Sequence, residues 1–315
     1  MVRSLWSAAT GMNAQQTNVD TIANNLANVN TVGYKSQVAQ FKSLLYQTLQ
    51  TATTTANGDP KPTSSQVGLG VRTSSINNLF SQGAMLSSQS SSALAIQGAG
   101  FFAVRGANNQ ISYTRNGDFT WAIAGNDLML TTSDGSAILD TQGRPIVVSL
   151  ATVGARYTAA FNEYLAEWRA NNTNPDGSLK NPNLSDPVMA NLNTLTLVSN
   201  QIIIDSKGAI NYSFGGIDFP LNVEVGLFQF ANVGGLERIG NSLYQPTAAS
   251  GPAQNEATAL GLRRSSIAQN FLEGSNVYVA DEMVNLIVAQ RAYEMNSKAI
   301  TTSDEMLQTA NNLKR

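Results

Sequence analysis

The chain has 315 residues, of which only 13% are charged, and its formal net charge is −2 at neutral pH. It contains neither histidine nor cysteine. This excludes Ser–His–Asp and Cys–His catalysis, and it removes the ligands that zinc sites use most. Low charge without a basic stripe argues against a nucleic-acid partner. The 21 acidic residues scatter over turns rather than forming a catalytic pair. We therefore predict that the protein is not an enzyme and has no catalytic residues, no cofactor and no metal.

Residues 1–34 are predicted to form a helix with a narrow apolar stripe. Spacings of three and four alternate along it, as in helices that pack along their lengths. The stripe consists of Leu5, Ala8, Met12, Gln15, Val19, Ile22, Leu26 and Val29. Gly33 suits the left-handed position that ends a helix. Since Arg3 and Asp20 are the only charged side chains before Tyr34, the remaining faces suit burial by neighbouring copies better than contact with water. The alternative is a solitary helical hairpin folded onto its own domain.

Residues 35–95 are predicted to be a connecting region. Its beginning, up to Tyr46, is expected to be extended and then to form one or two helical turns. Residues 47–66 are rich in Thr, Ser and Ala and have no apolar periodicity. Composition alone leaves open whether this tract is a flexible linker or an ordered extended segment.

Residues 96–230 are predicted to form an outer domain rich in antiparallel β-structure, with a barrel-like arrangement. Short apolar runs between turn signals indicate its strands. Including one run just before this range, the expected strands cover residues 94–96, 101–104, 111–114, 119–123, 128–130, 146–150, 201–204 and 221–230. Asn116-Gly117 and Asp134-Gly135 are expected at hairpin turns. Residues 151–198 break the β pattern with a helical segment and a proline-rich loop, and are interpreted as an insertion.

Residues 231–274 are predicted to return the chain to a final helix within residues 275–315, capped by Ser275 or Asn276. Its stripe consists of Val279, Met283, Leu286, Gln290, Tyr293, Ser297, Ile300 and Leu307. Two such stripes at opposite ends of a chain can pair. The predicted fold is therefore α+β, with paired terminal helices forming a coiled coil and a mainly β middle region.

Several motifs resemble those of the bacterial flagellar axial proteins, the family of rod and hook subunits. NNLANVNTVGYK at residues 24–35 is similar to the signature of that family, and residues 275–307 look like its shared C-terminal helix. IQGAGFFAV, YTRNGDFTW and GLFQFANVGGLERIGNSLY in the middle are also similar. The signature positions are Asn24, Asn25, Leu26, Ala27, Asn28, Gly33, Ser275, Asn276 and Val277. Residues 151–198 depart from the family pattern.

The resemblance implies a structural subunit that polymerises into a tubular drive shaft and transmits torque from motor to hook. The pattern is most similar to that of distal rod subunits; hook and proximal rod subunits are the alternatives. Implied partners are further copies of the chain, proximal rod and hook subunits, the P-ring and L-ring, and the flagellar type III export apparatus. The implied location is the basal body, from the periplasm to the outer membrane, after export without a cleaved signal peptide. A secreted glycan-binding or glycan-cleaving β protein with helical ends is the alternative from another class.

The resemblance also implies a role for two segments. Residues 47–66 fall where distal rod subunits carry a tract that braces neighbouring copies. Residues 151–198 are expected on the outer surface of the polymer, because an insertion in a repeating lattice must project where it displaces no copy.

Overall fold

The computed structural model describes residues 2–50, 65–106, 108–125, 127–149, 151–154, 201–214, 217–259 and 261–313. Most of the predicted tract 47–66 and nearly all of the predicted insertion 151–198 lie outside these ranges. The chain divides into two compact units. Unit 1 contains residues 1–83 and 275–315, and unit 2 contains residues 84–274.

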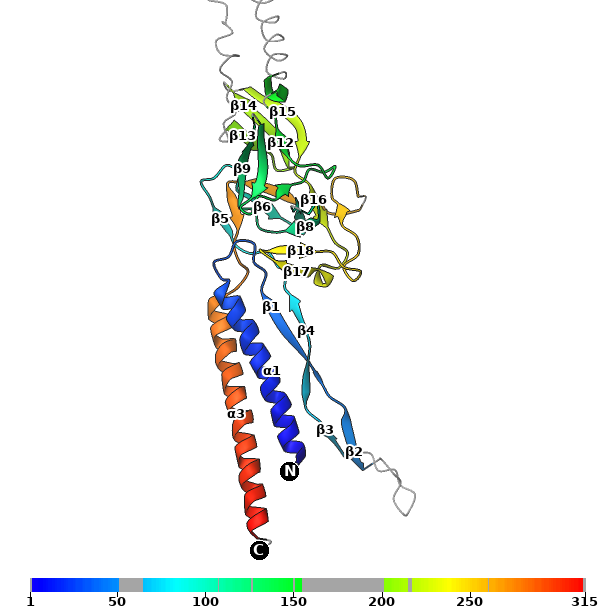
Figure 1. Cartoon of the computed structure of the whole chain (residues 1–315), viewed down its shortest axis with the longest axis vertical. Coiled ribbons are helices and arrows are strands. Elements are labelled where there is room, and N and C mark those ends of the chain that lie inside the picture. Colours follow the sequence, from blue (N-terminus) through cyan, green and yellow to red (C-terminus); the bar gives the residue numbers. More distant parts are fainter. Residues whose placement is uncertain are drawn as a thin grey trace, which may run out of the picture. The chain divides into compact units, whose positions relative to one another are not determined.

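Unit 1 consists of two long helices and a pair of narrow β-ribbons (Figure 1). The helices are α1 (Val2–Ala27) and α3 (Val279–Asn312). The strands are β1 (Gln37–Ser43), β2 (Tyr46–Gln50), β3 (Ser65–Gly68) and β4 (Val71–Asn78). The first helix ends at Ala27, short of the predicted end near Gly33, and Gly33 has a φ of +67°, the left-handed conformation expected of it.

The helical turns predicted before Tyr46 are wrong. Residues 37–43 are instead extended and pair with β4, from Gln37 opposite Asn78 to Ser43 opposite Val71. The ends of the tract 47–66 are also extended, because β2 pairs with β3. The β1–β4 ribbon packs on α1, where the Val71 backbone N–H donates to the Thr10 hydroxyl at 3.3 Å.

Unit 2 is built from short strands. In chain order they are β5 (Met85–Ser87), β6 (Leu94–Gln97), β7 (Phe101–Arg105), β8 (Ile111–Thr114), β9 (Phe119–Ala124), β10 (Asp127–Thr132), β11 (Ala137–Ile138), β12 (Val147–Val148), β13 (Ile202–Ile204), β14 (Ala209–Phe214), β15 (Ile217–Glu224), β16 (Leu227–Gln229), β17 (Glu237–Gly240), β18 (Leu243–Gln245), β19 (Gln254–Asn255), β20 (Ser266–Gln269) and β21 (Phe271–Glu273). A short 3₁₀ turn, η3 (Val233–Gly235), precedes β17.

The strand pairings among the described residues of unit 2 are antiparallel, as predicted. The barrel-like arrangement is wrong for this part of the chain. The largest sheet runs along an open path, β12-β10-β11-β7-β8-β18-β17, whose end strands do not pair with each other, while β9, β16 and β19 branch from it. The order β13-β14-β15 forms a separate sheet, and β20 with β6 and β21 with β5 form two ribbons.

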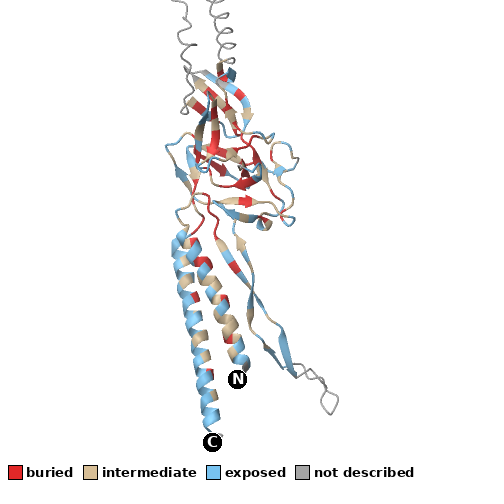
Figure 2. Cartoon of the chain, viewed as in Figure 1, coloured by how far each residue is buried: buried red, intermediate tan, exposed pale blue. Residues whose placement is uncertain are grey.

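The main hydrophobic core lies inside unit 2 (Figure 2). Asp134-Gly135 turns the chain between β10 and β11, as predicted. Asn116-Gly117 does not form the expected hairpin, because β8 pairs with β7 and β18 whereas β9 pairs with β10. A methyl group at Gly117 would lie only 1.5 Å from the Leu94 carbonyl oxygen, so glycine is required there by the close approach of another strand.

The three middle motifs meet in a second buried cluster of unit 2. Its aromatic rings pack edge to face, which adds to the energy of burial; they belong to Phe101, Tyr113, Phe228, Phe230 and Tyr244. The Arg115 guanidinium lies 4.9 Å from the Phe101 ring centre and forms an ion pair of 3.3 Å with Glu273, both side chains being almost fully buried. These motifs therefore stabilise the fold of unit 2.

Candidate assembly surface

The two helices of unit 1 lie side by side in opposite directions. The Ser4 and Ser303 hydroxyls are 3.4 Å apart near the start of α1, and the Asn25 amide donates to Glu282 at 3.0 Å near its end. This juxtaposition of the two ends of the chain was predicted. The coiled-coil pairing itself stays a prediction.

Small and polar residues line the contact between the helices. Ala8, Ala289 and Ser303 are buried. A methyl group at Gly11 would lie 2.8 Å from the Asn296 amide nitrogen, so the helices approach closely at this point. The predicted stripes included Ala8 but not Gly11, Ala289 or Ser303. Their signal is the recurrence of Ala, Gly and Ser three and four residues apart.

Most of the larger predicted stripe residues lie beside this contact. Ile22 is buried. The half-buried members are Leu5, Met12, Val19, Leu26 and Val29 in and after α1, and Leu286, Ile300 and Leu307 in α3. The exposed members are Val279, Met283 and Tyr293, whose exposed fractions are 45%, 42% and 43%. In the single chain, the stripes therefore keep much apolar surface in contact with solvent.

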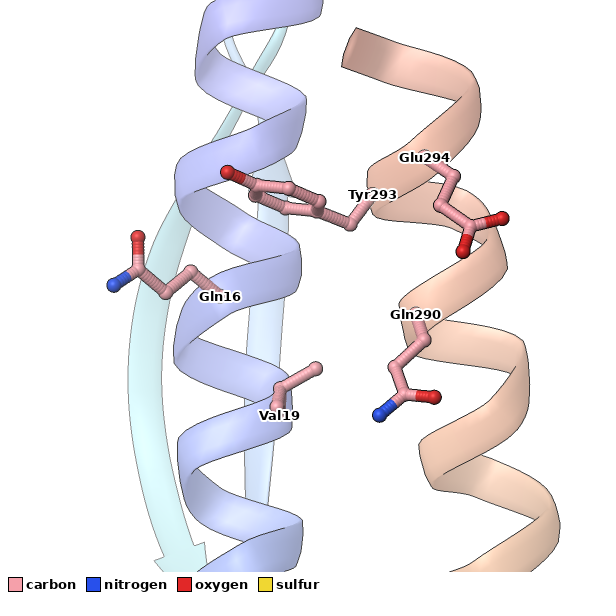
Figure 3. A pocket seen from close by; sticks show the side chains of 5 residues that line it. All are labelled: Gln16, Val19, Gln290, Tyr293 and Glu294. Atoms are coloured by element: carbon pink, nitrogen blue, oxygen red, sulfur yellow. The ribbon is translucent and has the colours of Figure 1, made fainter.

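A hollow of about 370 Å³ opens between the helices (Figure 3). Gln16 and Val19 of α1 and Gln290, Tyr293 and Glu294 of α3 line it. In this view the ribbon strands lie behind α1.

A polar junction ends the helix pair, and Asn25 is at its centre with only 1% of its surface exposed. Its amide nitrogen donates to the Gln37 carbonyl at 2.8 Å and to Glu282. Its oxygen accepts from the Gln37 N–H at 2.8 Å and from the Tyr34 hydroxyl at 3.2 Å. One side chain thereby connects α1, α3 and the segment that leads into β1.

Asn276 holds the same segment from the other side. Its oxygen accepts from the Ser36 N–H at 2.7 Å, and its nitrogen donates to the Leu79 carbonyl at 2.8 Å. The predicted capping role of Ser275 or Asn276 is wrong, because α3 begins after Tyr278 and has no side-chain cap bond. The Asn276 side chain instead forms hydrogen bonds within the junction. The buried Lys35 also belongs to the junction, because its ammonium group donates to the Ser81 carbonyl at 2.8 Å.

The remaining signature residues surround the junction. The Asn24 amide donates to Gln37 Oε1 at 3.3 Å, and the Asn28 amide donates to the Asn24 carbonyl at 2.9 Å. Ala27 is the last residue of α1, and Val277 is buried. The Ser275 hydroxyl accepts from the Val277 N–H at 3.3 Å. The signature residues therefore hold together the C-terminal end of α1, the N-terminal end of α3 and the segment that leads into β1.

Glu282 is a half-buried carboxyl group at the junction. Burial raises the pKa of Glu282 above the ordinary carboxyl value, and the like charge of Asp281 adds to this, while the hydrogen bond from Asn25 lowers it in part. The ionised form is thus disfavoured by its surroundings.

The described residues show no cluster of three or more acidic, histidine or cysteine side chains that could hold a metal ion. Neither α1 nor α3 contains an apolar stretch of the kind needed to cross a membrane, as judged on their described residues.

Three segments of the chain match families of flagellar proteins. Residues 5–35 match the family described as flagella basal body rod protein, and residues 95–162 match the D1 domain of flagellar hook protein FlgE/F/G. Residues 268–313 match the C-terminal region of flagellar basal body rod FlgEFG proteins. The first and last matches contain most of α1, all of α3, and the Asn25, Asn276 and Glu282 side chains of the polar junction.

Similarity to individual proteins extends over the full chain. The chain is 36% identical to the flagellar basal-body rod protein FlgG of Borreliella burgdorferi, with 100% of both chains covered. It is 33% identical to the protein of the same name from Bacillus subtilis, again with 100% of both covered. Its identity to the flagellar hook protein FlgE of Borreliella burgdorferi is 24%.

Proposed function

Because the chain belongs to the family of the flagellar basal-body rod protein FlgG, we propose that it is a structural subunit of the distal rod of the bacterial flagellum. In this role it polymerises into a tubular shaft that transmits torque to the hook. The observation that carries the proposal is full-length similarity to rod proteins, with both helical ends of the chain included.

The helix pair has the properties expected of an assembly element. It keeps large apolar side chains partly exposed, and α1 has almost no charged residues that would have to be desolvated on burial. We propose that neighbouring copies cover these surfaces, and that the helices complete a coiled coil in the polymer. A shaft needs large interfaces, and helices packed along their lengths supply them.

The partners follow from this position. We propose that the polymer joins proximal rod subunits at one end and hook subunits at the other. The P-ring and L-ring surround it between the periplasm and the outer membrane, and the type III export apparatus delivers the chain without a cleaved signal peptide. Residues 47–66 are proposed to brace neighbouring copies, and residues 151–198 to project from the outer surface.

A hook subunit is the second candidate within the family. Against the two Borreliella burgdorferi relatives, identity is 36% to the rod protein and 24% to the hook protein. Both matches cover the full length of both chains, so the difference of 12 percentage points in identity favours the rod.

Electron microscopy of the purified, concentrated protein tests the proposal. Tubes or protofilament fragments are the expected result. Material that stays monomeric under all assembly conditions and hydrolyses peptidoglycan would contradict it and favour a glycan-acting protein. Rescue of motility in a bacterium that lacks its own distal rod gene, but not in one that lacks its hook gene, separates the two family candidates.

A further inference from the structure

We propose that a cavity inside unit 2 binds a small zwitterion of the amino-acid type, a molecule that carries both an ammonium and a carboxylate group. The cavity has a volume of about 290 Å³, which is at the small end of the range found for ligand pockets. Its lining belongs entirely to unit 2. The proposal therefore goes beyond the proposed function and does not depend on polymerisation.

The cavity lies where strands of three separate sheets come together. The sheet β13-β14-β15 contributes Lys207 from the turn between β13 and β14, and Glu224 from the end of β15. The large sheet contributes Leu227, the first residue of β16. The segment between β19 and β20 contributes Glu256 and Arg264. Four charged side chains, two of each sign, thus line one small cavity.

Glu256 is a buried and firmly oriented carboxylate, with only 4% of its surface exposed. Its Oε1 accepts from the Gln229 amide and from the Ser265 hydroxyl, both at 2.8 Å. Its Oε2 accepts from the Ser265 backbone N–H at 2.6 Å. These three donors are neutral, and no residue in the described ranges forms an ion pair with Glu256. A carboxylate has about four acceptor positions, so Oε2 can accept one more hydrogen bond, and an ammonium group would also balance the charge.

The glycines of the GAGFF motif make room for this carboxylate. A methyl group at Gly100 would lie 2.5 Å from Glu256 Oε1, and one at Gly98 would lie 2.5 Å from the Ser265 hydroxyl oxygen. The Gly100 N–H also donates to that hydroxyl at 3.0 Å. The motif therefore fixes Ser265, and Ser265 fixes Glu256. Such supporting contacts hold a binding group in place before its ligand arrives.

The other three charged groups of the lining are exposed and unpaired with one another. Arg264 lies along the wall, because its Nη2 donates to the carbonyl of Ala257, another lining residue, at 2.9 Å. Across the part of the chain that the structure describes, neither Lys207 nor Arg264 forms an ion pair with Glu224 or Glu256. A ligand with a single charge would be attracted by two of the four groups and repelled by the other two. A zwitterion can pair its ammonium with the carboxylates and its carboxylate with the cations.

Ligand-observed NMR titrations of the full-length, unassembled chain test the proposal, with alanine and alanyl-alanine as probes. N-acetylalanine lacks the ammonium group, and alaninamide lacks the carboxylate. We expect binding of a zwitterion at millimolar concentration, with each analogue at least about fivefold weaker than alanine, because it loses charge-assisted hydrogen bonds. The relative affinities of the two probes distinguish a free amino acid from a peptide. Binding of neither probe, or equal binding of alanine and an analogue, would overturn the proposal.

The Arg263-Arg264 pair supplies a test with a matched control. Both side chains are exposed, but only Arg264 belongs to the lining. Arg264→Ala is expected to weaken alanine binding by about twofold to fivefold, the range of an exposed ion pair. Arg263→Ala removes the same charge next to the cavity and should leave the affinity unchanged. Equal weakening by both variants would show that binding follows the overall charge and not the cavity.

Glu256→Gln tests the position of the ammonium group. It removes the buried charge at nearly constant size, and alanine binding is expected to weaken by about tenfold or more. Thermal unfolding checks that the variant folds. Glu224→Gln changes an exposed residue and is measured in parallel, so that a carboxylate of the lining is tested even if Glu256→Gln does not fold. Native affinity in every folded variant of the two would contradict the proposal, while the proposed function would stand.

Discussion

Asn25 uses every hydrogen-bonding position of its side chain. An amide has two N–H donors and two acceptor positions on its oxygen, and all four are engaged with Gln37, Glu282 and Tyr34. Aspartate has the same shape but no donor when ionised. Leucine could make none of these four hydrogen bonds. The position is therefore specific for asparagine on chemical grounds alone.

Replacing Asn25 by Asp is expected to destabilise unit 1 by about 2–4 kcal/mol, because it removes both donors and places a buried charge against Glu282. Denaturant unfolding followed by helix circular dichroism measures the loss. Asn13→Asp introduces the same change at an exposed position of α1 and should cost no more than about 0.5 kcal/mol. Equal effects at the two positions would show that the junction has no special role.

Glu282→Gln is expected to stabilise unit 1 at neutral pH. Because the folded-state pKa of Glu282 is raised, the folded form binds more protons than the unfolded form as that carboxyl titrates. Its contribution to stability is therefore present at low pH and is lost as pH rises through the folded pKa. Glutamine keeps the accepting oxygen and carries no charge. Its advantage over the native residue should be largest at pH 7 and should shrink toward pH 4; an advantage independent of pH would rule out this explanation.

The contact between α1 and α3 shows how small residues set the distance between two helices. Alanine in a helix interior is favoured over glycine by about 1 kcal/mol, yet a methyl group at Gly11 would crowd the Asn296 amide. We expect Gly11→Ala to stabilise unit 1 by about 1 kcal/mol in an Asn296→Ala background, and by clearly less in the native chain. A double-mutant cycle measures the coupling, expected to be at least about 0.5 kcal/mol. Full additivity would show that the helices do not meet there.

Local sequence predicted the strands of unit 2 that are short apolar runs between turn residues, such as β6 to β10, but not β14, β17, β18 or the strands from β19 to β21. It failed where a distant partner decides the conformation. The local sequence of residues 37–43 favours neither a helix nor a strand clearly. The segment is a strand because it pairs with residues 71–78. Similarly, Asn116-Gly117 has hairpin chemistry, but the distant strand at Leu94 determines its role.

The sequence predicted the two helices of the candidate assembly surface, but not the residues at their closest contact or the partners of the signature asparagines. The stripes located both helices, since their period is a local property. They did not identify the closest contact, because a periodicity of large apolar residues cannot tell a contact within one chain from a contact between chains. The signature asparagines were noticed by resemblance, whereas their partners Glu282, Gln37 and Ser36 depend on three segments meeting in space.

At the scale of the whole molecule, residues 51–64 can be removed without breaking a described pairing, because Gln50 lies opposite Ser65 in the β2–β3 ribbon. Joining these two residues through Asn-Gly provides a two-residue hairpin turn. We expect the thermal unfolding of unit 2 to be unchanged and the polymer to bend more easily in electron micrographs. Replacement by a Gly/Ser segment of equal length separates the effect of sequence from that of length. Unchanged polymer stiffness in both variants would remove the proposed bracing role.

The ribbon of β5 and β21 has a mechanical consequence. The chain enters unit 2 at Ala84 and leaves it at Gly274, and these residues are bonded by a backbone hydrogen bond of 2.8 Å. Tension on the two connections would therefore pull neighbouring antiparallel strands apart from one end, a loading geometry that breaks one backbone bond at a time. Glu273 is in the first strand pair to be loaded, and its side chain is held by Arg115, the residue that directly follows β8. The buried ion pair thus acts as a stop that transfers load into the body of unit 2 before the strands can peel.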